Sequence, residues 1–178
     1  MAKREALREL QSRLAERLQA ARSETRAVSW LAVDCAGAGL LVPLATAGEI
    51  FPVGALLPVP HTRPWFLGVA NLRGGLHGVV DLAAFLGLRP PLARDALREQ
   101  ARLLAFNPRL GSHCAVLVDR LAGLRSRQQL QPDTDAANAA PRPEFAAGGR
   151  WRDADGRVWQ EIDLAALARH EMFLAIGA

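Results

Sequence analysis

Pairs of short apolar runs, each pair joined by a turn-forming segment, are the feature that most limits the fold of this chain. AVSWLAVD and GLLVPL flank residues 35–38, and FLGVANL and LHGVVD flank residues 73–75. RLLAF and HCAVLVD flank residues 107–112, and GGRWRD and GRVWQEID meet at residues 154–156. Short strands at close spacing, separated by glycine-containing turns, are typical of β-barrels and sandwiches. The sequence therefore predicts a mostly β fold.

The first 26 residues follow a different pattern. Leucines recur every three or four positions from Leu7 to Leu18, and most other positions are charged or alanine. This spacing predicts an amphipathic helix. We expect a helical arm over residues 1–26, which either packs on its own domain or docks a partner. A single β domain is expected over residues 27–172.

Three segments lack a strand pattern. Residues 52–64 contain four prolines and are expected to form a loop. Residues 89–100 separate the early strands from the later ones, with room for a short helix after Pro91. Residues 131–149 are rich in Pro, Ala, Asp and Gly, and predict a long loop.

The charge distribution argues against nucleic acid as a partner. The net charge is +4 and the pI is about 10.3. Most of this excess lies in residues 1–26, which carry seven basic and four acidic side chains, so the rest of the chain is nearly neutral. A nucleic-acid domain needs a basic face, usually with stacking aromatic side chains. Neither kind of cluster is present in the β region.

The sequence also points to a cytoplasmic protein without membrane insertion. No run of about 18 apolar residues is present, and the first ten residues have no apolar core of the kind a signal peptide needs. The two cysteines, Cys35 and Cys114, fall inside strand-like runs. We expect both to be buried free thiols, which suits a reducing compartment; a disulfide is the lesser alternative.

Three aspartates recur in similar surroundings, with apolar residues before and after each. They could be read as catalytic carboxylates, but an aspartate after a strand also caps a helical turn by accepting a backbone N–H. We expect capping at Asp81 and Asp163, with Gly87 closing the turn that Asp81 opens. Arginine follows Asp119, so a turn or a surface ion pair is expected there.

Enzyme signatures are absent from the sequence. There is no GxSxG elbow and no GxxxxGK[ST] loop, and Lys3 is the only lysine. His113 and Cys114 are neighbours in a strand, so they point to opposite faces and cannot act as a base–nucleophile pair. We expect no enzyme activity, no metal and no cofactor. The four histidines are far apart in the sequence without metal-ligand spacing: His61, His77, His113 and His170.

Arg73 remains as the candidate functional residue. On its own it could be a solvated charge in a turn. Asn71 and Arg73 are both polar in an apolar region, so they could share one face of a strand. Glu49 is the only acidic residue between Asp34 and Asp81. A Glu49–Arg73 ion pair is therefore a hypothesis that the structure can test.

The segment FLGVANLRGGLHGVVDL resembles the signature of the CheW-like coupling proteins. GLLVPLATAGEI is similar to the early strand and turn of that family, and LLPVPHTRPWFLG to its proline-containing approach. HCAVLVDRLAGL resembles its later strand, and DADGRVWQEIDLAALA its closing hairpin and helix. The resemblance covers about residues 28–170. It departs at Gly78, where the family commonly has proline.

The resemblance implies two packed SH3-like β-barrels of five strands each, acting as a non-catalytic adaptor. Its partners would be the cytoplasmic tip of a methyl-accepting chemoreceptor and the regulatory domain of a CheA-type histidine kinase, at membrane-bound receptor arrays. The helical extension is most similar to members that serve type IV pilus twitching motility. The alternative is a stand-alone β-barrel module that binds peptides or ligands outside kinase signalling. Receptor-groove candidates are Glu49, Asn71, Arg73 and Gly74.

Deleting residues 1–26 is expected to leave a folded β domain, because the strand pattern begins after them. The melting curve of the truncated protein should stay cooperative, while partner binding weakens. A truncated protein without a cooperative melt would show that the arm belongs to the core.

Overall fold

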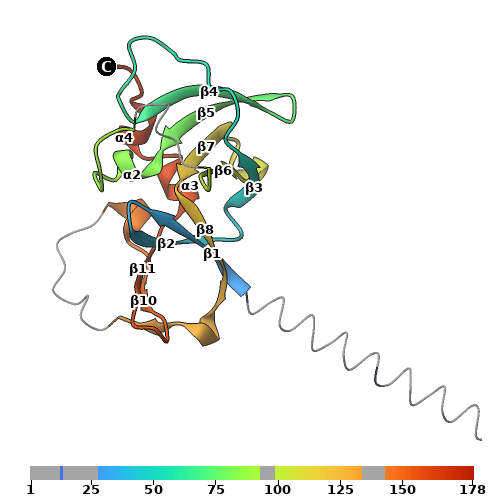
Figure 1. Cartoon of the computed structure of the whole chain (residues 1–178), viewed down its shortest axis with the longest axis vertical. Coiled ribbons are helices and arrows are strands. Elements are labelled where there is room, and N and C mark those ends of the chain that lie inside the picture. Colours follow the sequence, from blue (N-terminus) through green and yellow to red (C-terminus); the bar gives the residue numbers. More distant parts are fainter. Residues whose placement is uncertain (1–12, 14–27, 93–98, 134–142) are drawn as a thin grey trace, which may run out of the picture.

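Two β-sheets packed face to face make up the described part of the chain (Figure 1). The computed structural model describes residue 13 and residues 28–92, 99–133 and 143–178. Apart from residue 13, the helical arm predicted for residues 1–26 lies outside the described residues. So does most of residues 92–100, where a short helix was expected after Pro91.

The first sheet contains both the first and the last strands of the described chain. Its strand order is β8-β1-β2-β11-β10-β9, and all neighbours are antiparallel except β2 and β11, which run parallel. Its strands are β1 (Val28–Cys35), β2 (Ala38–Pro43), β8 (Arg120–Ser126), β9 (Gln131–Pro132), β10 (Arg150–Arg152) and β11 (Val158–Glu161).

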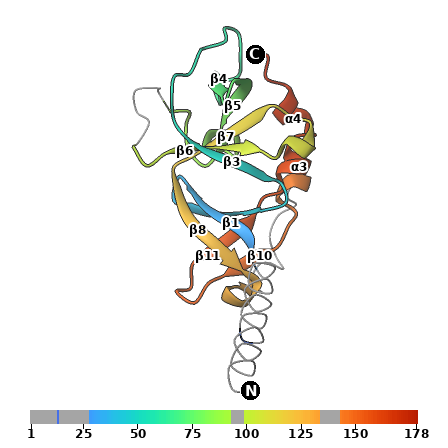
Figure 2. The same ribbon diagram turned by 90° about the vertical axis from the view of Figure 1, so that its right-hand side faces the viewer.

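The second sheet is formed by the middle of the chain. Its order is β3-β6-β7-β5-β4, with a parallel pairing between β5 and β7. Both Figure 1 and Figure 2 show it stacked on the first sheet, and Figure 2 shows the C-terminal helices α3 and α4 at one side of the stack. Its strands are β3 (Ala47–Pro52), β4 (Phe66–Leu72), β5 (Gly75–Asp81), β6 (Arg102–Phe106) and β7 (Cys114–Val118).

Short helical segments fill the corners between the sheets. The helices α2, α3 and α4 each have four residues, and the remaining turns are 3₁₀. The bounds are α2 (Leu82–Phe85), α3 (Leu164–Leu167), α4 (Glu171–Leu174) and the 3₁₀ turns Pro108–Leu110, Arg127–Gln129 and Glu144–Ala146.

Alternation along the strands divides the core into three apolar clusters. Successive side chains of a strand point to opposite faces. Val80 of β5 therefore joins the cluster between the sheets, whereas Val79 joins a second cluster on the other face of β5. In the first sheet, Leu40 faces the partner sheet and Leu41 packs into a third cluster with Trp159. Several strands are thus buried on both faces, which explains why their sequences are apolar almost throughout.

The third cluster contains Trp30 and Trp159, with Trp151 packed against them. Arginines and acidic side chains hold these tryptophan rings in place. The guanidinium of Arg157 lies 4.3 Å from the ring centre of Trp159, and that of Arg127 lies 4.2 Å from Trp151. The Trp159 indole N–H donates to Asp153 at 2.8 Å. Cation–π contacts of this kind, together with hydrogen-bonded indole N–H groups, allow large tryptophan rings to pack on a small sheet.

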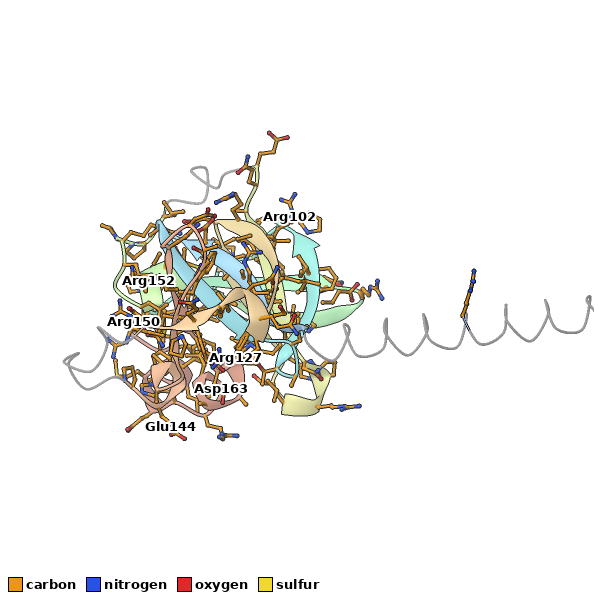
Figure 3. The ribbon with its side chains drawn as sticks, turned by 90° about the horizontal axis from the view of Figure 1, so that it is seen from below. Arg102, Arg127, Glu144, Arg150, Arg152 and Asp163 are labelled. Atoms are coloured by element: carbon orange, nitrogen blue, oxygen red, sulfur yellow. The ribbon has the colours of Figure 1, made fainter. Side chains whose placement is uncertain are left out.

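Asp133 provides a related ion cluster at the edge of this sheet. Arg150 and Arg152 lie close together in Figure 3, and both contact its carboxylate, at 3.3 and 2.9 Å. Asp133 is almost fully buried, so the two guanidiniums offset the cost of burying its charge. These contacts attach strand β10 to the end of β9.

The structure confirms the mostly β fold and all four predicted strand pairs. Three strands were missed, which are β3, β8 and the two-residue β9. The exposed and half-buried residues of β3 and β8 do not alternate regularly, and the pairings of these two strands include register shifts. The prediction of a continuous loop over residues 131–149 was wrong, because β9 and the 3₁₀ turn at 144–146 lie within it. The sixth strand of the first sheet is the two-residue β9.

The capping predictions for Asp81 and Asp163 are confirmed. Asp81 Oδ1 accepts the N–H of Ala84, and Asp163 Oδ1 accepts the N–H of Ala165. The turn after Asp81 closes at Gly87, whose N–H donates to the Ala84 carbonyl. Each cap satisfies one backbone donor that the first turn of a helix leaves free.

Asp81 has a second role that the sequence did not indicate. Its side chain is fully buried, and Oδ2 contacts Arg89 at 2.6 Å. Arg89 also contacts Asp119 at 3.2 Å, and Asp119 accepts the N–H of Ala36 at 2.7 Å. Burial alone would lower the pKa of Arg89, but hydrogen bonds and charges from both aspartates raise it above its ordinary value. This chain of contacts links the second sheet to the β1–β2 turn of the first.

The two cysteines are free, as expected. Cys35 is fully buried, and burial together with the charge of Asp119 raises the pKa of its thiol to about 12. Cys114 is half-buried rather than buried, which corrects the expectation for that residue.

Replacing Arg89 with methionine is expected to lower the free energy of unfolding by about 3 kcal/mol or more, because it leaves the buried Asp81 carboxylate without its cation. Adding Asp81→Asn should restore part of the loss, since the amide oxygen keeps the cap without the charge. Urea denaturation measures both effects.

Arg120→Ala is the matched control. Arg120 is half exposed, and Arg157 still contacts Asp34 after its removal. We expect a loss of no more than about 1 kcal/mol. Equal losses in Arg89→Met and Arg120→Ala would contradict the buried-pair interpretation.

Candidate functional site

The turn between β4 and β5 places Arg73 at the tip of a hairpin. Leu72 pairs with Gly75, so only Arg73 and Gly74 lie in the loop. Their φ angles are +50° and +82°. Two successive positive φ values define the type I′ turn that matches the twist of a two-residue hairpin. Gly74 adopts this conformation without strain, whereas Arg73 is a non-glycine residue in the left-handed region.

Asn71 fixes the shape of this turn. Its side-chain oxygen accepts the N–H of Gly74 at 2.8 Å. An asparagine that bonds the backbone three residues later closes a turn much as a backbone carbonyl does. Asn71 is exposed, and this bond gives it a structural task beside any contact with a partner.

Arg73 and Glu49 form an ion pair, which confirms the pairing hypothesis. The guanidinium nitrogen and the carboxylate oxygen lie 2.5 Å apart. Glu49 belongs to β3 and Arg73 follows β4, and these strands are the opposite edges of the second sheet. The sheet is therefore curled until its two edges meet. The side chains are 76% and 42% exposed, so the pair contributes about 0–1 kcal/mol to stability.

A cavity of about 460 Å³ lies beside the ion pair. Its apolar wall includes Phe51, Ala70 and Leu72, and its polar wall includes Glu49 and Arg73. A hollow with an apolar floor and a charged lip suits an amphipathic segment of a partner. Its lining residues are Glu49, Phe51, Pro52, Gly54, Ala55, Ala70, Asn71, Leu72 and Arg73.

A larger cavity, of about 740 Å³, lies elsewhere and shares no lining residue with the first. It is bounded by the β1–β2 turn, the end of α2 near Leu88, the 3₁₀ turn at 144–146 and strand β11. Sequence reasoning missed it because Phe145 of its wall sits in a segment read as a loop. Its wall is mostly apolar and also includes Arg150 and Arg157.

The structure changes the interpretation of the histidines. The rings of His77 and His113 lie 5.5 Å apart, although the sequence separates them widely. Within the described residues, no group of three or more His, Cys, Asp or Glu side chains is placed to hold a metal ion.

In the same part of the chain, no helix has the length and apolar content to span a membrane.

Comparison with known proteins decides the family. A sequence model described as CheW-like domain matches residues 29–172, most of the chain. The chain belongs to the CheW-like domain family. The resemblance noted in the segment around Arg73 is thereby confirmed along the β region.

Relatives of the CheW-like chain agree with this assignment. It is 29% identical to Protein PilI of Pseudomonas aeruginosa over 171 residues, covering 93% of this chain and 89% of that one. A 41-residue segment is 46% identical to a probable chemotaxis protein CheW of Rhizobium etli, covering 22% of this chain and 26% of that protein. The crystal structure of the scaffolding protein TtCheW from Thermoanaerobacter tengcongensis matches with a TM-score of 0.60 at 16% identity. That match covers 76% of this chain and 88% of the other, and it shows a shared fold.

Gly74→Val is expected to destabilise the CheW-like domain by more than about 1 kcal/mol, because valine is strained at positive φ. A β-carbon at Gly74 would meet no atom within 4 Å, so the loss would come from the backbone alone. Gly54→Val is the control, since Gly54 is equally open but has no positive φ. Equal melting temperatures for the two variants would contradict the turn assignment.

Proposed function

We propose that this chain is a non-catalytic adaptor that couples a chemoreceptor to a histidine kinase. The partners are the cytoplasmic tip of a methyl-accepting chemoreceptor and the regulatory domain of a CheA-type kinase. The proposal is supported by the CheW-like family match and by the order of family motifs along the chain. Similarity to Protein PilI over 93% of the chain supports a role in type IV pilus twitching motility.

The observation that carries the receptor assignment is the Arg73–Glu49 pair beside an apolar cavity. A helical receptor tip presents apolar side chains flanked by polar ones, and this hollow offers both kinds of wall. Arg73 keeps most of its surface exposed while one nitrogen contacts Glu49. The remaining guanidinium N–H groups are free to donate to a carboxylate or carbonyl of the partner.

An adaptor acts by holding two partners in a fixed geometry, so its surfaces replace catalytic groups. Receptor and kinase then use different faces of one rigid body. Three cores and a buried ion network supply the rigidity. The protein works in the cytoplasm, recruited to membrane-bound arrays by its receptor.

Arg73→Ala is expected to weaken binding of the receptor tip several-fold, because alanine lacks the fixed fork of donors. Kinase binding should be unchanged, since the kinase uses another surface. The melting temperature should change little, because the ion pair is exposed. Calorimetric titration of one protein sample with a receptor-tip fragment and with a kinase regulatory domain measures all three.

Two further variants sharpen this test. Arg109→Ala removes an exposed arginine from another turn and should leave receptor binding intact. The double variant Glu49→Arg with Arg73→Glu should recover part of the binding only if the two residues act chiefly as a pair. Equal loss of receptor and kinase binding in Arg73→Ala, or a collapsed melt, would assign Arg73 a structural role instead. Failure to bind any CheA-type regulatory domain would favour the stand-alone binding module.

A further inference from the structure

We infer that His77 and His113 form a two-imidazole site for a divalent late transition-metal ion such as Zn²⁺ or Ni²⁺. His77 lies in strand β5 of the second sheet, and His113 directly precedes the neighbouring strand β7. Gly78 of β5 pairs with Cys114 of β7 in parallel, and the N–H of Gly78 donates to the carbonyl of His113. His77 and His113 each stand one position before this pair, so their side chains emerge on the same face.

The distance between the rings suits chelation. Their centroids lie 5.5 Å apart and the rings are inclined by 71°. With metal–nitrogen bonds of about 2.1 Å and a roughly tetrahedral angle, two coordinated imidazoles have centroids about 5 Å apart. The observed separation of the two ring centroids is therefore close to the one that shared coordination of a single ion requires. His113 is exposed and His77 half-buried, so an ion can reach them from solvent.

A hydrogen bond prepares His77 as a ligand. Its Nδ1 lies 3.0 Å from the carbonyl oxygen of Gly75. A carbonyl can only accept, so Nδ1 carries the proton and the neutral ring has its lone pair on Nε2. Metal-binding histidines are held in this way, with the other ring N–H donated to a carbonyl or carboxylate.

Gly75 leaves the space that this ring occupies. A β-carbon at Gly75 would lie 3.1 Å from Cε1 of His77 and 3.6 Å from Nδ1. Gly75 does not have a positive φ, so its backbone does not demand glycine. The absence of a side chain at Gly75 thus leaves room for the His77 ring. Two coordination positions of a tetrahedral ion would remain for water or for a partner side chain.

Cys114 is not part of the site. It packs against the cluster between the sheets, whereas Ala115, which shares the face of His113, belongs to the second cluster. The proposal therefore rests on nitrogen ligands alone. It is independent of the receptor and kinase assignments, because no partner is needed for two imidazoles to bind an ion.

The test is calorimetric titration of the untagged full chain with ZnCl₂ and with NiCl₂, followed by melting with and without metal. The wild type should bind one ion saturably, and its melting temperature should rise with metal. His77→Asn and His113→Asn should each weaken binding about tenfold or more, and should remove the rise in melting temperature. Binding should also weaken on acidification, because protons compete for the imidazole nitrogens.

Three control variants make the result decisive. His61→Asn removes one imidazole elsewhere and Cys114→Ser removes a thiol; both should bind metal as the wild type does. Gly75→Ala should weaken binding while its metal-free melting temperature stays within a few degrees of the wild type, because it displaces only the His77 ring. Absence of saturable binding, or equal weakening in His61→Asn and His77→Asn, would overturn the proposal. Loss of binding in Cys114→Ser alone would assign the ion to the thiol and also overturn it.

Discussion

The contact chain Asp81–Arg89–Asp119, which begins at a fully buried carboxylate, holds the two sheets in one arrangement. Asp81 ends a strand of the second sheet, Asp119 stands at the crossing from β7 to β8, and Asp119 accepts the N–H of Ala36 in the first sheet. Apolar packing alone is non-directional and would allow the sheets to slide. A carboxylate that is fully buried tolerates only the geometry that keeps its cation and its hydrogen bonds.

The Arg73 hairpin contributes little to the stability of the fold. Arg73 has a positive φ and an exposed ion pair, neither of which adds much to the free energy of unfolding. Asn71 and Gly74 supply the local bonds and the backbone freedom that keep the turn closed. The contrast with Asp81 is clear, since that residue is buried, paired and remote from the cavity beside Arg73. Stability therefore depends on the buried Asp81 ion pair, whereas the recognition that we propose falls on the exposed Arg73 pair.

Local patterns in the sequence predicted what depends on neighbours along the chain. Glycine-containing turns located the hairpins, and Asp81 and Asp163 were recognised as caps. Contacts between residues far apart in the sequence could not be predicted in the same way. Arg89 reaches Asp81 only after α2 turns the chain. His77 lies beside His113 only because β5 and β7 pair in parallel. The Arg73–Glu49 pair could be guessed because acids are scarce around it. The edge strand β8 gave no signal because its side chains do not alternate between buried and exposed.

The strand order has a consequence for how this protein is made on the ribosome. Strands β1 and β2 emerge first, yet β8 and β11, their partners at either edge of that hairpin, are among the last to be synthesised. The whole second sheet, from β3 to β7, is translated in between and contains all of its own neighbours. The β1–β2 hairpin, which is apolar on both faces, therefore stays partly exposed until the second sheet has been synthesised and has folded. Nascent chains stalled before β8 should contain a folded second sheet and an incomplete first sheet. During that interval the apolar surface of the incomplete sheet is accessible to a chaperone.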